Sequence, residues 1–279
     1  MIVLLLFFNA CQEQQTPWEG DTLLFGHRGS GSGIYDGRLI ENTLPSVSYA
    51  LQFLDGTEID LQMSADGTVW IFHDDEITHL CDTVPAAFPC VPLATDAYLK
   101  KQRICREGVE DKIYRLEEVL PLLNQPEFSD RFLSLDVKGY FTEACFKGRN
   151  ASKEYLEQMA EEVHRLIREY QLADRVIIET SYTTFLDKMK ALNPNVRCHY
   201  LGYHDFTSKM VKTLKKGYDG ITFNLRDTSV YEANLQLAKD EGLEIQLWSV
   251  HSREELEKVL PLNPFAIQIS KIPIEEFGR

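Results

Sequence analysis

Short apolar runs alternate along the chain with longer segments in which apolar residues recur at helical spacing. The apolar runs predict strands at residues 22–27, 57–63, 131–137, 175–180, 196–202, 218–224, 244–250 and 265–270. Segments of helical period at 44–54, 152–171, 184–193, 208–217, 230–242 and 253–262 predict amphipathic helices between several of these strands. Strands that alternate with helices favour a parallel sheet, and eight such strands fit a TIM-type (β/α)8 barrel.

A ninth apolar run, TVWIFHD at 68–74, follows the strand at 57–63 after only Ser-Ala-Asp-Gly. Asp-Gly between alternating strands is a strong hairpin signal, so this run is predicted to lie antiparallel to its predecessor and not to be a barrel strand. Residues 76–112 contain three cysteines and show weak periodicity. They are predicted to form a small insertion over one end of the barrel.

Length and charge narrow the possible classes of protein. A chain of 279 residues fits either two small domains or one α/β barrel, and no linker divides it. The formal charge of −14, with no basic block longer than a pair, would repel a nucleic-acid backbone. We therefore expect one barrel domain over residues 22–279 and no nucleic-acid partner.

The apolar segment at residues 1–10 is too short to span a bilayer and ends in small residues directly before Cys11. It resembles a truncated bacterial lipoprotein signal, after which Cys11 would carry lipid and residues 11–21 would form a tether. A plain secretory signal or an apolar N-terminal tail is the alternative, since no Lys or Arg precedes Arg28. The first interpretation predicts a lipid-anchored protein of the bacterial cell envelope.

The five remaining cysteines show no CxxC pair and no ligand-like spacing with histidine, which argues against zinc. In an exported protein the first three, Cys81, Cys90 and Cys105, provide for one disulfide, and Cys81 and Cys90 are the closest pair in sequence. Sequence spacing does not determine which cysteines meet.

Acidic residues recur at strand spacing near two predicted strand ends. Glu58 and Asp60 share one face of a strand, as do Asp136 and Lys138 on another. Facing a packed barrel interior, the carboxylates would cost several kcal/mol without a compensating cation. An oxygen-only set of this kind suits Mg²⁺ or Ca²⁺ better than Zn²⁺. Taken alone, one such pair is also typical of a solvated strand end or a salt bridge.

Two histidines end neighbouring predicted strands. His27 ends the first strand and His73 ends the hairpin strand, so both can reach the same end of the barrel. Together they suit general acid and base catalysis, while Arg28 suits contact with a phosphate oxygen. A single histidine at a strand end is more often a capping or surface residue. Tyr140, Phe141, Tyr200, Tyr203, His199, His204 and His251 are weaker candidates that also lie near strand ends.

The segments HRG at 27–29, ENT at 41–43, EID at 58–60 and HDD at 73–75, in this order, resemble the glycerophosphodiester phosphodiesterase family. The later segments LEEVL at 116–120 and LWSVHS at 247–252 are similar to that family's helix and tryptophan-bearing strand. The resemblance extends over residues 22–272, densely as far as Asp75.

This resemblance implies a metal-dependent enzyme that hydrolyses glycerophosphodiesters to glycerol 3-phosphate and an alcohol. It implies His27 and His73 as the acid and base, without saying which is which. The implied substrate contacts are Arg28, Lys138 and Trp248. The implied ligands of a Ca²⁺ or Mg²⁺ ion are Glu58, Asp60 and Asp136, with Glu41 close by.

Two positions depart from the family pattern. Asp136 stands where the family usually has glutamate, and the chain ends its last strand in IQIS where the family commonly has a threonine-aspartate pair. Two other functions are therefore weighed: a phospholipase-type or sphingomyelinase-D-like phosphodiesterase, and a non-catalytic lipoprotein that binds a phospho-ligand. The ENT and ExD segments favour the glycerophosphodiester phosphodiesterase over the phospholipase-type enzymes, and the two histidines argue against the non-catalytic protein.

Overall fold

The computed structural model describes residues 21–77, 79–82, 90–139, 145 and 149–277. The predicted signal segment at 1–10, Cys11 and nearly all of the tether lie outside these described residues. Tyr140 and Phe141 lie outside them too.

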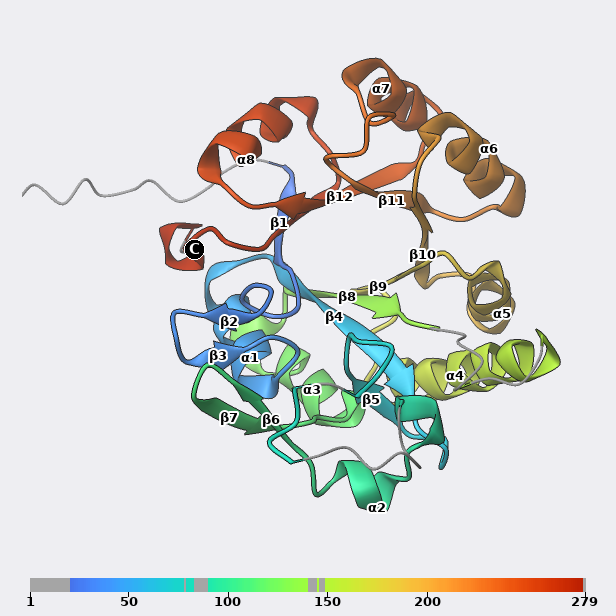
Figure 1. Ribbon diagram of the computed structural model, residues 1–279. Coiled ribbons are helices and arrows are strands. Elements are labelled where there is room, and N and C mark those ends of the chain that lie inside the picture. The colour runs from blue at the N-terminus through green and yellow to red at the C-terminus, as the bar shows by residue number, and fades with distance from the viewer. Residues whose placement is uncertain (1–20, 78, 83–89, 140–144, 146–148, 278–279) are drawn as a thin grey trace, which may run out of the picture.

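A closed ring of parallel strands forms the centre of the molecule (Figure 1). Within the described residues each strand of the ring pairs in parallel with the next, and β1 pairs with both β13 and β4. The ring therefore closes as the predicted TIM-type barrel, which is confirmed. Its strands are β1 (Leu23–Gly26), β4 (Gly56–Met63), β8 (Phe132–Val137), β9 (Val176–Thr180), β10 (Arg197–Gly202), β11 (Gly220–Asn224), β12 (Glu244–Val250) and β13 (Ala266–Ile269).

Helices surround the ring on its outside, as the view down the barrel shows (Figure 1). They are α1 (Leu44–Phe53), α3 (Leu116–Leu123), α4 (Arg149–Glu169), α5 (Thr183–Leu192), α6 (Phe206–Lys216), α7 (Glu232–Asp240) and α8 (Arg253–Val259). Short 3-10 turns occupy Val91–Leu93, Pro126–Phe128, Leu260–Leu262 and Ile274–Phe277. The six helices expected from periodicity are all present, with ends shifted by no more than three residues.

Strand β4 shows how the barrel separates its apolar and polar side chains. All eight of its residues are buried, because helices cover its outer face and other strands surround its inner face. Ile59 and Leu61 point outward into the core between barrel and helices. The alternate residues Glu58 and Asp60 therefore point into the barrel.

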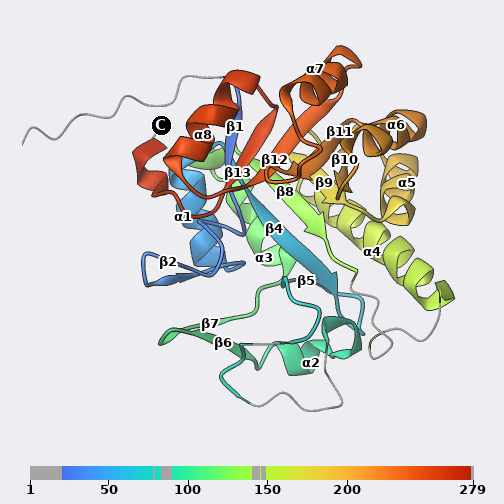
Figure 2. The same ribbon diagram turned by 45° about the horizontal axis from the view of Figure 1, so that its top comes forward.

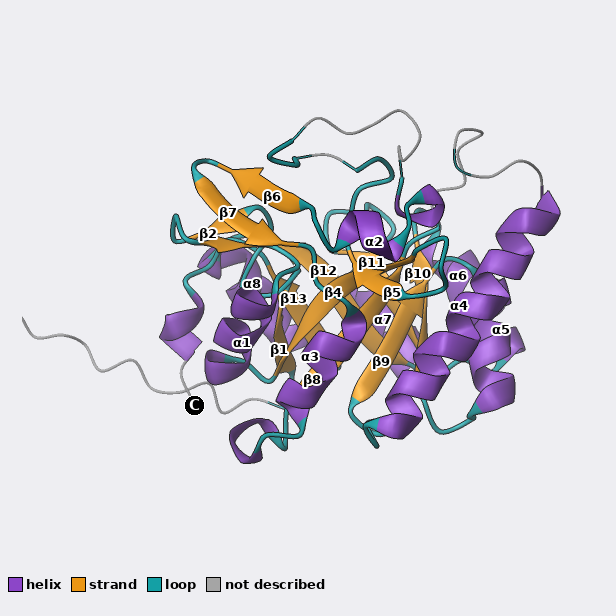
Figure 3. Ribbon diagram, turned by 90° about the horizontal axis from the view of Figure 1, so that it is seen from below, coloured by secondary structure: helices purple, strands orange, loops and turns teal. Residues whose placement is uncertain are grey.

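The strand after the Asp-Gly turn is β5 (Val69–Ile71), and it pairs antiparallel with the last residues of β4, as predicted. The insertion then follows with α2 (Asp96–Leu99) and a hairpin of β6 (Arg103–Arg106) and β7 (Val109–Lys112). Figures 2 and 3 show α2, β6 and β7 together at one end of the barrel. This is the end at which the parallel strands terminate, called here the mouth. A second small hairpin, β2 (Ile34–Tyr35) and β3 (Leu39–Ile40), also lies there.

The hairpin inside the insertion is a feature that the hydrophobic pattern does not predict. Its strands are mostly polar, and only Ile104 is fully buried among their eight residues. The turn residues Glu107 and Gly108 both have positive φ, at 48° and 86°. Two such residues form the type I′ turn that matches the twist of a hairpin.

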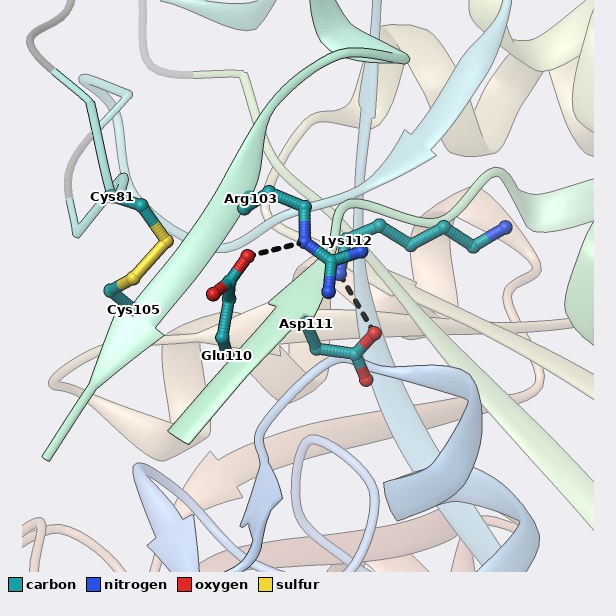
Figure 4. Close-up of a disulfide and its surroundings, with 6 residues drawn as sticks. All are labelled: Cys81, Arg103, Cys105, Glu110, Asp111 and Lys112. Atoms are coloured by element: carbon teal, nitrogen blue, oxygen red, sulfur yellow. Dashed lines mark hydrogen bonds and ion pairs between the residues drawn. A yellow bond between two sulfur atoms is a disulfide. The ribbon is translucent and has the colours of Figure 1, made fainter. Parts of the chain in front are cut away.

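The cysteines pair differently from the expectation. Cys81 bonds to Cys105 and Cys90 to Cys145, so the pair closest in sequence does not form, and the described residues contain two disulfides instead of one. The physical reason is the backbone pairing of residues 79–81 with β6. The N–H of Cys105 donates to the carbonyl of His79, and that of Cys81 donates to the carbonyl of Arg103, which brings the two cysteines side by side. Figure 4 shows the Cys81–Cys105 disulfide beside the hairpin. Cys198 is a free thiol in the core.

No helix within the described part of the chain is both long enough and apolar enough to cross a bilayer.

Gly26 ends β1 directly before His27, and the chain folds back tightly over it. A Cβ at this position would lie 1.9 Å from the carbonyl oxygen of Gly29. We expect Gly26→Ala to lower the free energy of unfolding by about 1–3 kcal/mol, measured by urea denaturation, because the turn must open to admit the methyl group.

The matched control is Gly37→Ala, where a Cβ would meet open space and only the positive φ of 63° opposes the change. Its cost should be about 1 kcal/mol. Equal losses in both variants would show that the close approach at Gly26 does not limit stability.

Candidate active site

The predicted acidic residues meet at the mouth. Asp60 on β4 is in register with Asp136 on the adjacent β8, and Glu58 lies one inward-facing position earlier. One carboxylate oxygen from each of the three lies within 4.8 Å of the others. Their residue exposures are 1% for Glu58, 1% for Asp60 and 9% for Asp136, so water does little to screen their mutual repulsion.

Repulsion and burial affect the protonation of this cluster. Burial, and then the charge of Asp60, raises the pKa of Glu58 well above its usual range. Burial also raises the pKa of Asp136, against the opposing charge of Lys138. Burial acts on Asp60 in the same sense, but the charges of Lys138 and Arg28 hold its pKa below the usual range.

The cluster fits a hard divalent cation by its donor chemistry. Glu58 Oε1 and Asp136 Oδ1 are buried and accept no hydrogen bond from any residue that the structure describes. Unpaired carboxylate oxygens in such a site leave room for a ligand that supplies positive charge. The side chains in position to hold the cation are Glu58, Asp60 and Asp136.

Glu41 lies outside this cluster. Its Oε2 accepts from Arg28 Nη1 at 3.2 Å and from the backbone N–H of Gly33 at 2.6 Å, and its Oε1 faces Arg106 Nη2 at 2.9 Å. Lys138, in contrast, reaches into the cluster, with Nζ 3.0 Å from Asp60 Oδ1 and in contact with Asp136. Of these two predicted site residues, only Lys138 lies among the acids.

The two histidines are held by different partners. His27 Nδ1 lies 2.8 Å from the hydroxyl of Ser270, the last residue of the IQIS segment. Burial and the charge of Arg28 lower the pKa of His27 to about 3. His73 Nδ1 lies 2.8 Å from Asp74 Oδ1, so a carboxylate orients this second ring.

A cavity of about 120 Å³ brings most of the predicted residues together. It is smaller than the roughly 300–1,000 Å³ of common ligand pockets, which suits a small polar group. Its lining residues are His27, Arg28, His73, Asp136, Lys138, Glu179, Leu201, Tyr203, Trp248 and Gln268. Glu58, Asp60 and Glu41 are not in this lining.

The aromatic wall of the cavity is formed by Trp248 on β12 and Tyr203, whose rings meet edge to face with centroids 6.4 Å apart. Of the weaker candidates from the sequence, Tyr203 therefore does lie in the site. Tyr200 is buried in the core, and the side chain of His204 is 93% exposed beside Asp227. Neither of these two lines the cavity.

Glu179 is a site residue that the sequence analysis missed. It lies on β9, in register with Asp136, and is 2% exposed. Its oxygens accept from Gln268 at 2.7 Å, from Gln246 at 2.7 Å and from Ser134 at 3.2 Å, each on a different strand. The only sequence signal was a charged residue inside an apolar strand, VIIET. Burial and the charge of Asp136 raise the pKa of Glu179 to about 8.

Comparison with known proteins identifies the family of this chain. A model of the Glycerophosphoryl diester phosphodiesterase family matches residues 27–267, which is most of the chain. The chain belongs to this family. The resemblance found in the sequence is thereby confirmed, and the chain is a phosphodiesterase by class.

Two curated members of the family are named glycerophosphodiester phosphodiesterase. The one from Bacillus altitudinis is 24% identical over 249 residues, covering 86% of this chain and 91% of that protein. The one from Caldanaerobacter subterraneus subsp. tengcongensis is 21% identical over 248 residues, covering 86% of this chain and 90% of that protein.

Solved structures share the fold. A glycerophosphodiester phosphodiesterase from Parabacteroides distasonis has a TM-score of 0.73 at 18% identity, covering 92% of this chain and 95% of its own. A phosphodiesterase from Oleispira antarctica, solved with the product sn-glycerol-3-phosphate, has a TM-score of 0.71 at 17% identity, covering 92% and 93%.

The raised pKa of Glu179 predicts a pH dependence of stability. Between pH 4.5 and pH 8 the folded protein retains a proton on Glu179 that the unfolded chain has lost. The stability that the folded state gains from this proton is fully present below pH 4.5 and is lost as the pH rises through 8. In Glu179→Gln, the free energy of unfolding should therefore fall less over this range than in the wild type, as measured by urea denaturation at several pH values.

The control is Glu232→Gln, which changes an exposed carboxylate on α7 and should follow the wild-type profile. Parallel profiles for Glu179→Gln and the wild type would contradict the prediction.

Proposed function

We propose that this chain hydrolyses glycerophosphodiesters to glycerol 3-phosphate and an alcohol, with a divalent cation held by Glu58, Asp60 and Asp136. The observation that carries the proposal is one mouth cavity lined by two histidines, Arg28 and Asp136, where Asp136 also belongs to the acid cluster with Glu58 and Asp60. Family membership and the product complex of the Oleispira antarctica relative support the same substrate class.

When bound, a Ca²⁺ or Mg²⁺ ion would supply positive charge to the phosphoryl oxygens and the attacking oxygen. The chain's own cations act beside it. Arg28 and Lys138 line the cavity and offer N–H donors to the phosphate, whose charge grows during attack. Positioning of the diester by these groups reduces the entropy cost of the reaction.

The surroundings of the two histidines favour different roles. A lowered pKa keeps His27 neutral, and in the tautomer whose Nδ1–H donates to the Ser270 hydroxyl the Nε2 atom is a proton acceptor. We assign His27 as the base that deprotonates the glycerol 2-hydroxyl or a water. Asp74 offsets positive charge on His73, which we assign as the acid that protonates the leaving alkoxide.

Trp248 and Tyr203 give the cavity one apolar side. A glycerol carbon chain has an apolar face that packs against such rings, while the phosphate lies toward Arg28 and Lys138. We therefore place the glycerol moiety against the aromatic wall. Asp136, one methylene shorter than the glutamate common in the family, reaches the cluster because β8 and β4 pair directly.

The assay that tests the proposal is release of glycerol 3-phosphate from glycerophosphocholine and glycerophosphoethanolamine. We expect EDTA to abolish release and Mg²⁺ or Ca²⁺ to restore it, because uncompensated carboxylates repel the phosphate. A parallel assay on intact phospholipid separates the phospholipase alternative. Activity on intact lipid alone would contradict the proposal, as would activity that EDTA leaves unchanged.

His27→Ala and His73→Ala should each lower kcat by about 10²-fold or more. The reason is that each removes one proton transfer while the barrel stays intact. His204→Ala, at an exposed histidine near the same strand ends, is the matched control and should retain wild-type turnover. A histidine whose alanine variant keeps near wild-type kcat has no part in the proton transfers.

We also propose that the protein works at the bacterial cell envelope, anchored by lipid at Cys11. The apolar segment before Cys11 and the two disulfides, which persist in oxidising compartments, support this location. On expression of the full chain, the wild type should partition into detergent and Cys11→Ser into the aqueous phase. Identical partitioning of both would contradict the anchor.

A further inference from the structure

The insertion places a second arginine beside the mouth. Arg106 ends β6, and its Nη2 lies 2.9 Å from Glu41 Oε1. Its side chain is 23% exposed and that of Glu41 is 7% exposed, so the ion pair is largely shielded from water. Removing one partner of an ion pair with this burial costs more free energy than removing one partner of a pair at the surface.

Glu41 connects Arg106 to the phosphate-binding side chain. Its other oxygen, Oε2, accepts from Arg28 Nη1 at 3.2 Å. One buried carboxylate is thus shared by two guanidinium groups, one on each oxygen. The charge that Arg106 neutralises on Glu41 is charge that would otherwise attract Arg28 more strongly.

Arg28 has few other ways to hold its position. Its Nε lies 3.4 Å from Asp60 Oδ2, and its backbone N–H donates to Glu58 Oε2 at 2.9 Å. Its φ of 59° is in the left-handed region, which ordinary residues adopt only when their surroundings require it. The direction of the guanidinium therefore depends on the balance between Asp60 on one side and Glu41 on the other.

The position of Arg106 is itself braced. The preceding residue, Cys105, forms the disulfide to Cys81, and its backbone N–H donates to His79. Figure 4 shows this disulfide on the same strand as Arg103, whose Nε bonds to Glu110 at 2.8 Å. A braced strand end presents Arg106 to Glu41 at little cost in conformational entropy.

We propose that Arg106 is a positioning residue: it holds Glu41 so that the Arg28 guanidinium stays directed at the substrate phosphate. The inference rests on the proposed function, since it assumes that Arg28 binds phosphate. It assigns to the insertion a role in the reaction at the mouth. Removal of Arg106 leaves Arg28 as the one guanidinium on Glu41, which draws it away from the phosphate.

The test compares Arg106→Gln, Arg106→Lys and the control Arg103→Gln. Arg103 lies on the same strand, but its side chain is 48% exposed and forms its ion pair with the exposed Glu110. Two readouts are used: steady-state hydrolysis of glycerophosphocholine, and binding of inorganic phosphate by calorimetry in the presence of Ca²⁺.

We expect Arg106→Gln to raise KM and the phosphate Kd about tenfold, with a smaller change in kcat, since small misplacements of a binding group are costly. Arg106→Lys should recover part of the loss, because an ammonium restores the charge but not the planar fork. Arg103→Gln should match the wild type. In a Glu41→Gln background, loss of Arg106 should have little further effect.

The proposal is overturned if Arg106→Gln binds phosphate as the wild type does. It is also overturned if Arg106→Gln weakens phosphate binding by the same factor in the Glu41→Gln background. A wild type that binds no phosphate would overturn it too. A wild type that binds phosphate but turns over no glycerophosphodiester would remove the proposed function, and the phosphate Kd values would still decide the role of Arg106. Thermal unfolding of each variant separates a loss of folding from a loss of positioning.

Discussion

The cost of burying like charges is the constraint on which the rest of this structure depends. Glu58, Asp60 and Asp136 each place one carboxylate oxygen within 4.8 Å of the others, and all three residues are buried. A folded protein tolerates such a group only where cations and donors offset it. Arg28 and Lys138 do so in part, and the unpaired oxygens of Glu58 and Asp136 show that the compensation from the described residues is incomplete.

The barrel can hold buried charge because the two faces of each strand have different roles. Outward residues such as Ile59 and Leu135 join an apolar core with the helices, which supplies the stability that the polar interior cannot. The far end of the barrel interior is closed by Phe25, Ile177 and Ala266. Between these apolar side chains and the mouth, the amides of Gln246 and Gln268 hold Glu179. The mouth is thus free to hold charge.

The parts of the site that could be predicted are those that depend on strand period and on short motifs. Asp60 and Asp136 were expected to meet because residues two apart share a strand face and parallel strands end together. The same argument placed Lys138 among the acids. It did not place Glu41, whose loop turns it toward Arg28 and Arg106 and away from the cluster. Loop direction depends on contacts that no local pattern records.

Local sequence pattern also failed to predict the roles of Ser270, Glu179 and Arg106. None of the three belongs to a recognisable motif, and each gains its role from a partner more than 40 positions away in the sequence. Cysteine pairing failed as a prediction for a related reason, since backbone hydrogen bonds between residues 79–81 and β6, and not sequence distance, brought Cys105 to Cys81.

By itself the sequence determined the order of the barrel strands and of six surrounding helices, the barrel and the family, because these follow from periodicity and from motifs that are local. Only the tertiary structure decided which side chains share the mouth cavity, which cysteines bond and which charges face one another. The physical reason is range. Hydrophobic periodicity acts over a few residues, whereas electrostatic pairing and packing act between atoms close in space, whatever their distance along the chain.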